Sequence, residues 1–148
     1  MRVRVTKTFY FEMAHALHGY DGPCKNIHGH SYRLSVTVAG KTNSKTGNPK
    51  LGMVIDFTDL KKIINECVIK KFDHALVLNE NEEQISRLEK NLPAGNIIKV
   101  KYQPTCENLV AFFAGVIRNN LPDSVRLHHL KLRETPTSYA EWYAEDNT

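Results

Sequence analysis

Two stretches in which apolar and polar residues alternate constrain the fold of this chain more than any other feature. In residues 2–15 one parity, interrupted by Lys7, holds most of the apolar side chains and the other holds most of the polar ones. The first set is Val3, Val5, Phe9, Phe11 and Met13, with His15 at its end. Residues 28–39 repeat the pattern. Because side chains of a strand alternate between its two faces, each stretch predicts a half-buried strand. The stretches follow each other closely along the chain, so we expect them to pair antiparallel.

Two helical patterns lie downstream. The first follows Asp56 or Thr58, either of which can cap it, and its apolar residues recur at i, i+3, i+4 and i+7. The second begins at Pro104 and Thr105. Its expected buried face consists of Leu109, Phe112, Phe113, Val116 and Ile117.

Further strands are expected at 53–57 and 125–134, with 97–102 as a shorter candidate. The polar segment 79–96 reads as an insertion that can hold a short helix. Together these elements predict one α+β domain over residues 1–148, with a four-stranded antiparallel sheet and two helices on one face. The edge strands of such a sheet need a partner, and copies of the same chain are one solution.

Composition excludes several classes of protein. The chain has 148 residues, a net charge of +4 and no basic run interleaved with aromatic residues, so we expect no nucleic-acid partner. No stretch approaches the roughly 18 apolar residues of a membrane span, and the N-terminus lacks the apolar core of a signal peptide. The three cysteines give no disulfide framework. We therefore expect a cytoplasmic protein with a small anionic substrate.

Three histidines form the principal candidate site. His28 and His30 point to the same strand face, and His15 ends the preceding strand on its apolar face. Antiparallel pairing brings the end of one strand to the start of the next, which places all three together. Three imidazoles and a water form the open shell of a catalytic zinc ion. The alternative is three unrelated histidines with packing or turn roles, and we favour the zinc site.

A thiol and a histidine pair add to this chemistry. Cys24 lies in a Gly- and Pro-rich loop just before His28. It can be a fourth zinc ligand, which would make the site structural, or an acid–base group. Asp73 can orient His74 as a proton relay, but His74 can equally be a histidine that compensates the dipole at a helix C-terminus.

Glu134 is a carboxylate on the apolar face of the last predicted strand, where it needs a partner. It can form an ion pair or accept two N–H donors from a ligand ring. Thr105 and Glu107 fit a helix cap and a first-turn acid. His18, His128 and His129 are read as loop or structural residues.

Six ordered motifs resemble the 6-pyruvoyltetrahydropterin synthase superfamily over roughly residues 5–135. In chain order they are FEMAH with His15, CKNIHGH, TGNPKLGMVIDFTDLK, FDHALVLN, PTCEN and RET. The spacing in CKNIHGH is similar to the bacterial 6-carboxytetrahydropterin synthase branch of the queuosine pathway. The segment 138–148 extends past the usual end of the family.

This resemblance implies a tunnelling fold, in which the sheets of several subunits join into a barrel, and a homohexamer built as a dimer of trimers with sites at subunit interfaces. It implies Zn²⁺ on His15, His28 and His30. Cys24, Asp73, His74 and Glu134 would be catalytic, and Thr105, Glu107 and Glu134 would contact the pterin.

The resemblance further implies a lyase that converts 7,8-dihydroneopterin triphosphate to 6-carboxy-5,6,7,8-tetrahydropterin, acetaldehyde and triphosphate. Two alternatives remain open at this point. The same site could eliminate triphosphate to give 6-pyruvoyltetrahydropterin, or the chain could be a non-catalytic protein with a structural zinc site made by Cys24 and the three histidines.

Overall fold

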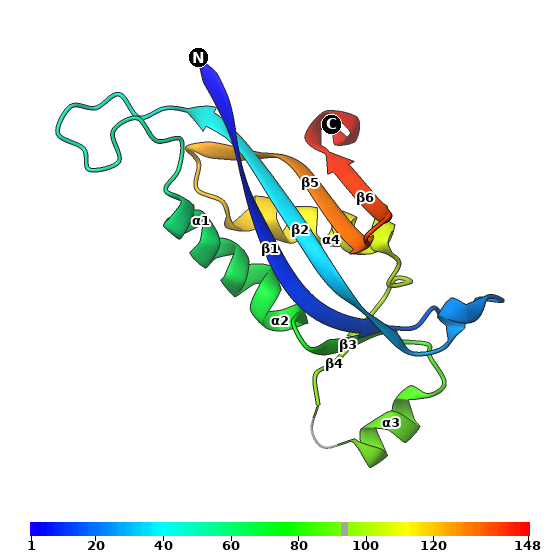
Figure 1. The fold of residues 1–148 in the computed structure, drawn as a ribbon. Coiled ribbons are helices and arrows are strands. Elements are labelled where there is room, and N and C mark those ends of the chain that lie inside the picture. The colour runs from blue at the N-terminus through cyan, green and yellow to red at the C-terminus, as the bar shows by residue number, and fades with distance from the viewer. Residues whose placement is uncertain (93–94) are drawn as a thin grey trace.

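A single curled six-stranded sheet organises the structure, a computed structural model that describes residues 1–92 and 95–148 (Figure 1). The order across the sheet is β4-β3-β1-β2-β5-β6. In chain order the strands are β1 (Arg2–His15), β2 (His28–Lys41), β3 (Ala75–Asn79), β4 (Ile97–Val100), β5 (Val125–Thr135) and β6 (Ser138–Tyr143). The fold is therefore α+β, as the sequence predicts.

The helices lie between the strands in sequence. They are α1 (Phe57–Ile64), which runs on through a π-helical turn (Asn65–Ile69) into α2 (Lys70–Phe72), then α3 (Ile85–Asn91) and α4 (Cys106–Asn120). Two short 3-10 turns cover Pro23–Lys25 and Ala144–Asn147. Within the described residues no helix is long and apolar enough to cross a membrane.

Strands β1 and β2 form the spine of the sheet, as their alternation predicts. They pair antiparallel over their full length, from Arg2 opposite Lys41 to His15 opposite His28. On each strand the side chains that share the parity of Phe11 or Leu34 face the core, whereas those of the other parity face away from it. This register places the end of β1 beside the start of β2, where the site is found.

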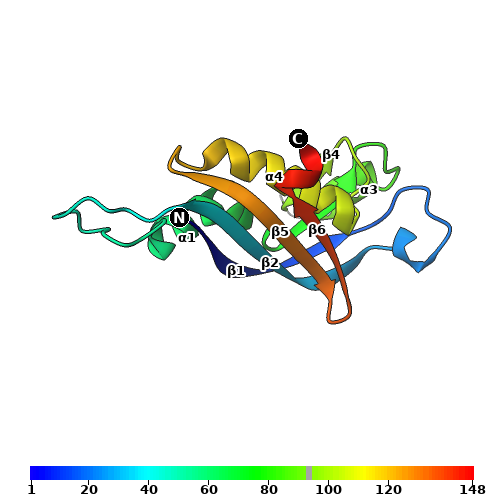
Figure 2. The ribbon, with the colours of Figure 1, turned by 90° about the horizontal axis from the view of Figure 1, so that it is seen from above.

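Two helical segments cover one face of the sheet, and its other face is left without a helix (Figure 2). The Asp56 carboxylate accepts from the Thr58 amide and caps α1, and the Thr105 hydroxyl accepts from the Asn108 amide and caps α4. On α4 the buried face differs from the expected one. Phe112 is 40% exposed, and Val110 is buried instead.

The expected four-stranded, wholly antiparallel sheet is wrong. Residues 53–57 form turns and the start of α1 rather than a strand, because both edges of β2 are already occupied by β1 and β5. Residues 75–79, which were assigned to no strand, pair parallel with β1 as β3, and β4 pairs parallel with β3. The supposed extension 138–148 supplies β6, which buries Trp142 against the core.

The polar segment 79–96 contains the expected short helix as α3, although residues 93–94 of that segment lie outside the described part of the chain. Ile85 on α3 packs with Leu78 and Ala16 in a small apolar cluster beside the main core. This cluster anchors the insertion next to the end of β1, close to the histidines.

Candidate active site

His15, His28 and His30 converge at the end of β1 and the start of β2. The register sets His15 opposite His28 and Met13 opposite His30, so the three rings share the core-facing side. One ring nitrogen from each residue lies within 4.8 Å of the other two. His15 is buried, and the other two are partly exposed. The structure thus confirms the predicted convergence.

Hydrogen bonds to the backbone determine which ring nitrogens are free. His15 Nδ1 lies 2.7 Å from the Pro104 carbonyl oxygen, and His28 Nδ1 lies 2.7 Å from the Asn26 carbonyl oxygen. A carbonyl oxygen can only accept, so in the neutral rings each Nδ1 carries the proton and each Nε2 carries a lone pair. The two Nε2 atoms lie 3.0 Å apart. Two lone pairs at that distance repel unless a cation holds them together.

The donor set fits zinc. Tetrahedral Zn–N bonds of about 2.0–2.1 Å separate two ligand nitrogens by roughly 3.3 Å, close to the observed pair. Among the described residues, His30 Nε2 is buried without a hydrogen-bond partner, so no protein group competes with a metal ion for this nitrogen. Burial lowers the pKa of His15 and of His30, so both rings favour the neutral form that binds metal.

Glu134 joins this cluster from β5. Its Oε1 lies 3.7 Å from His30 Nε2, and Tyr32 donates its hydroxyl hydrogen to Oε2 over 3.4 Å. Burial is the main cause that raises the pKa of Tyr32, and the Glu134 charge adds to it, so the phenol remains a donor. The carboxylate is therefore oriented by Tyr32 beside the histidines.

Asp73 and His74 form a second group, at the turn between α2 and β3. Asp73 Oδ1 lies 3.0 Å from His74 Nδ1 and accepts from the Glu12 amide at 2.9 Å. His74 has a left-handed backbone with φ of 62°, and its amide donates to the Glu12 carbonyl oxygen. These contacts clamp the pair to β1. The imidazole itself is 76% exposed.

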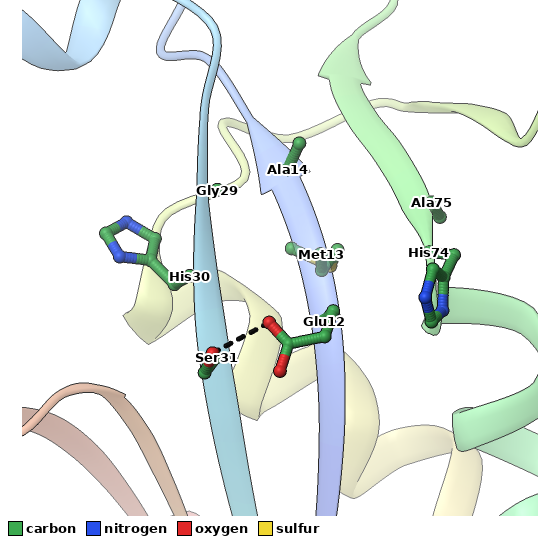
Figure 3. Close-up of a pocket in the computed structure, with 8 residues that line it drawn as sticks. All are labelled: Glu12, Met13, Ala14, Gly29, His30, Ser31, His74 and Ala75. Atoms are coloured by element: carbon green, nitrogen blue, oxygen red, sulfur yellow. Dashed lines mark hydrogen bonds between the residues drawn. The ribbon is translucent and has the colours of Figure 1, made fainter.

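A pocket of about 330 Å³ lies between this pair and the start of β2 (Figure 3). His74 and Ala75 line one side, Gly29, His30 and Ser31 line the other, and β1 runs between them. Glu12 lies in the middle and accepts from the Ser31 hydroxyl at 2.7 Å. The His30 imidazole points away from this opening and from His74, so the pocket adjoins both groups without bringing the two rings together (Figure 3).

The structure does not bring every predicted residue to this opening. Cys24 lies in the 3-10 turn, where its carbonyl oxygen accepts from the Leu17 amide, and among the described residues it is not part of the ligand cluster. Thr105 caps α4, and Glu107 is exposed in its first turn. In a single chain these three residues line neither the pocket with His74 nor the pocket with Glu134.

Three residues of the site were missed from the sequence. Tyr32 follows His30 at the same parity, so the alternation could have identified it. Pro104 acts through its carbonyl oxygen, which leaves no mark in a side-chain pattern. Glu12 anchors Asp73 through its backbone amide, and only the parallel pairing of β3 with β1 reveals this contact.

Comparison with known proteins agrees with the fold and the motifs. Residues 4–145 match the family model described as 6-pyruvoyl tetrahydropterin synthase. The chain is 37% identical over 142 residues to the 6-carboxy-5,6,7,8-tetrahydropterin synthase of Haemophilus influenzae, which covers 94% of this chain and 97% of the relative. The enzyme of that name from Aquifex aeolicus is 30% identical, with 98% and 100% of the two chains covered.

Solved structures share the fold. A crystal structure of an uncharacterized protein from Wolinella succinogenes superposes with a TM-score of 0.75 at 19% identity, covering 97% of this chain and 99% of the other. The 6-pyruvoyl tetrahydropterin synthase of Caenorhabditis elegans gives a TM-score of 0.70 at 23% identity, with 97% and 96% covered. On the match over residues 4–145, the chain belongs to the 6-pyruvoyl tetrahydropterin synthase family.

Proposed function

We propose that this chain is a zinc-dependent lyase that converts 7,8-dihydroneopterin triphosphate and water to 6-carboxy-5,6,7,8-tetrahydropterin, acetaldehyde and triphosphate. The observation that carries the proposal is the open three-histidine cluster with Glu134 beside it. The name of the Haemophilus influenzae relative supports the carboxy product.

His15, His28 and His30 would hold the zinc ion. Bound there, zinc supplies Lewis acidity that lowers the pKa of hydroxyls on the substrate side chain. The Pro104 and Asn26 carbonyl oxygens keep His15 and His28 in the tautomer that presents Nε2. Burial of His15 fixes its ring, so the site is preorganised.

Glu134 would anchor the pterin. The two oxygens of a carboxylate match the adjacent N–H donors of the pterin 2-amino and N3 edge, and each oxygen can accept more than one hydrogen bond. The hydroxyl of Tyr32 holds Oε2 and so sets the plane of the carboxylate. The ring would then lie in register with the histidines, which matters because small misplacements forfeit much of the proximity effect.

Cys24, Asp73 and His74 would move protons between the side chain and the ring. Asp73 Oδ1 lies 3.0 Å from His74 Nδ1 and would stabilise the charged imidazole, leaving Nε2 to exchange a proton. Thr105 and Glu107 would contact the pterin. Because one chain does not gather all of these residues around one opening, a neighbouring copy would complete the site.

The sheet edges support assembly. Among the described strands, β1 pairs on its outer edge only through Met13–His15, and β6 pairs only with β5. The unpaired edges of these described strands are therefore β6 on one side of the sheet, and β4 together with Arg2–Glu12 of β1 on the other, and unpaired edges invite strand addition. We propose that copies join β6 to β1 in rings, so that sheets close into a barrel, with a hexamer of two trimers.

The family model favours a second candidate reaction, elimination of triphosphate to 6-pyruvoyltetrahydropterin. Product analysis separates the two. Acetaldehyde released from 7,8-dihydroneopterin triphosphate supports the carboxy-forming reaction, whereas a diketo pterin without acetaldehyde contradicts it.

Cys24→Ala tests the remaining alternative, a structural zinc site. We expect the variant to retain zinc and its fold and to lose at least about 100-fold in turnover, the lower range for an acid–base group. Loss of zinc together with unfolding would instead identify Cys24 as a structural ligand.

A further inference from the structure

One face of the sheet is left without a helix (Figure 2). A row of three cations lies on this face. Arg33 on β2 is directly opposite Arg133 on β5, and Ser35 is opposite Lys131. Arg33, Arg133 and Lys131 therefore project from neighbouring positions of one face; we call them the cationic row. Like charges directly opposite each other on paired strands destabilise a sheet.

Glu141 on β6 is directly opposite Lys131, but its carboxylate pairs with His129 at 3.5 Å. Within residues 1–92 and 95–148, no Asp or Glu oxygen lies within ion-pair distance of the cationic row. Aromatic rings support the cations instead. The Arg33 guanidinium carbon lies 5.2 Å from the ring centroid of Tyr10, and Lys131 Nζ lies 3.8 Å from that of Tyr139. Such rings hold the charges in place without neutralising them.

Arg133 is fixed in two ways. Its guanidinium carbon lies 5.2 Å from the ring centroid of Tyr139, and its Nη1 donates to the Pro136 carbonyl oxygen at 2.7 Å. Neither contact removes its charge. A planar, preorganised guanidinium with unused N–H donors is suited to phosphate.

The cationic row is continuous with the active site. A pocket of about 630 Å³ is lined by His30 and Glu134 at one end and by Arg33 and Arg133 at the other. The ladder between β2 and β5 ends at these two arginines, and the lining of the pocket includes residues from both faces of the sheet. Gly29 also lines the pocket and contributes no side chain.

A smaller adjoining pocket extends the cationic surface. It has a volume of about 240 Å³ and shares Tyr10, Arg33 and Arg133 with the first pocket. Lys131, Thr8 and Ser35 complete its lining, and the two hydroxyls are hydrogen-bonded to each other at 3.1 Å. Hydroxyl donors between cations are a further feature suited to phosphate oxygens.

We propose that the cationic row binds the triphosphate of the substrate, while Glu134 and the histidines hold its pterin end. This assignment rests on the proposed function, because it takes the substrate to be a pterin with a triphosphate ester. Arg33 and Arg133 bind the phosphates nearest the pterin, and Lys131 binds the terminal phosphate with Thr8 and Ser35.

Titration calorimetry with inorganic triphosphate tests the site directly. Arg33→Gln and Arg133→Gln should each weaken binding by about 10-fold or more, the range for a charge-assisted phosphate contact. Arg126→Gln is the matched control. Arg126 lies on the same strand, opposite Ala39, at the far end of the same face, and its removal should change the affinity less than about two-fold.

Two measurements exclude indirect effects. The titrations are run on zinc-loaded and on metal-free protein, because triphosphate chelates zinc; the same loss in both forms assigns it to the arginines. Thermal unfolding without triphosphate should be unchanged or higher in both variants, since each removes a like-charge contact. Binding by wild type that neither arginine variant weakens overturns the proposal.

Steady-state kinetics separates this proposal from the proposed function. In both variants the KM for 7,8-dihydroneopterin triphosphate should rise with little change in kcat, and inhibition by unphosphorylated 7,8-dihydroneopterin should not change. Equal weakening of both pterins would refute a phosphate site. If wild type shows no turnover while triphosphate binding still depends on the arginines, the proposed reaction fails and the polyphosphate site stands.

Discussion

The effect of His28→Ala on the free energy of unfolding should have opposite signs in the metal-free and in the zinc-loaded protein. In the metal-free state His15 Nε2 and His28 Nε2 present lone pairs to each other at 3.0 Å. A buried acceptor without a donor costs about 1–3 kcal/mol, and His28→Ala opens His15 Nε2 to solvent. His28 is only partly buried, so its truncation leaves no enclosed cavity. We expect metal-free His28→Ala to unfold at a free energy equal to or above that of wild type.

Zinc should stabilise wild type and not the variant. At a free zinc concentration of 100 times the Kd, binding adds about 2.7 kcal/mol to the free energy of unfolding. For a chain of this size that is a rise in Tm of about 5–10 °C. His28→Ala keeps two ligands, so its affinity falls and its Tm should rise by less than about 2 °C at the same zinc concentration.

The assay is thermal unfolding followed by circular dichroism, in chelator and in buffered zinc, with urea unfolding for the free energies. His18→Ala is the control, because His18 is a loop histidine paired with Glu82 at 3.5 Å and lies outside the cluster. It should show the full zinc shift. A metal-free His28→Ala that loses more than about 2 kcal/mol would refute the lone-pair argument.

Three further predictions test the backbone, the pH response and the core. His74→Gly should unfold about 1 kcal/mol higher than His74→Ala in urea, because φ of 62° suits glycine, and equal values would contradict the left-handed turn. Burial lowers the pKa of His129 below 6.5, and the charge of Glu141 only partly opposes this. The unfolded chain therefore binds a proton at His129 more readily than the folded protein does, so the stability contributed by the neutral ring is complete above that pH and falls as the pH drops below it. In zinc-loaded protein, His129→Gln should therefore flatten the decline in Tm between about pH 7 and 5, and an unchanged slope would contradict this. Phe113→Ala should cost about 3–5 kcal/mol in urea unfolding, and Phe112→Ala on the same helix less than half of that, since the first ring is fully buried and the second is 40% exposed.

Strand parity made the central fold predictable. The alternation in residues 2–15 and 28–39 predicted two strands, their apolar faces and their antiparallel pairing. The antiparallel pairing also predicted that His15 lies beside His28 and His30, because it brings the end of the first strand to the start of the second, and parity places all three on the apolar face. Local chemistry also predicted a cap by Thr105 for α4 and by Asp56 or Thr58 for α1, and the structure shows Asp56 as the cap of α1.

The errors occurred where local pattern and tertiary context compete. Residues 53–57 contain enough apolar side chains for a strand, yet their half-buried Val54 and Ile55 pack on the core without a ladder. β3 is only five residues long, apolar on both faces, and stabilised by parallel pairing that no local pattern encodes. β6 does alternate, with Trp142 inward and Tyr143 partly exposed, and it was missed because the resemblance placed it past the usual end of the family.

The same contrast between local pattern and tertiary context separates the site residues on strands from those in turns and at helix starts. The positions of the site residues on strands could be predicted from parity. In one chain the three histidines form a cluster that could hold a metal ion, and Glu134 lies beside it. Cys24, Thr105 and Glu107 lie in a turn or at a helix start, where position depends on packing rather than on period, and one chain leaves them apart from that cluster. If Cys24 exchanges protons with the pterin, as we propose, another surface must bring the pterin to it. The unpaired edges of β6 and of β1 over Arg2–Glu12 are where a neighbouring copy can pair. The proposed reaction and the proposed oligomer therefore stand together, and a monomer with full turnover would contradict the catalytic roles given to Cys24 and His74.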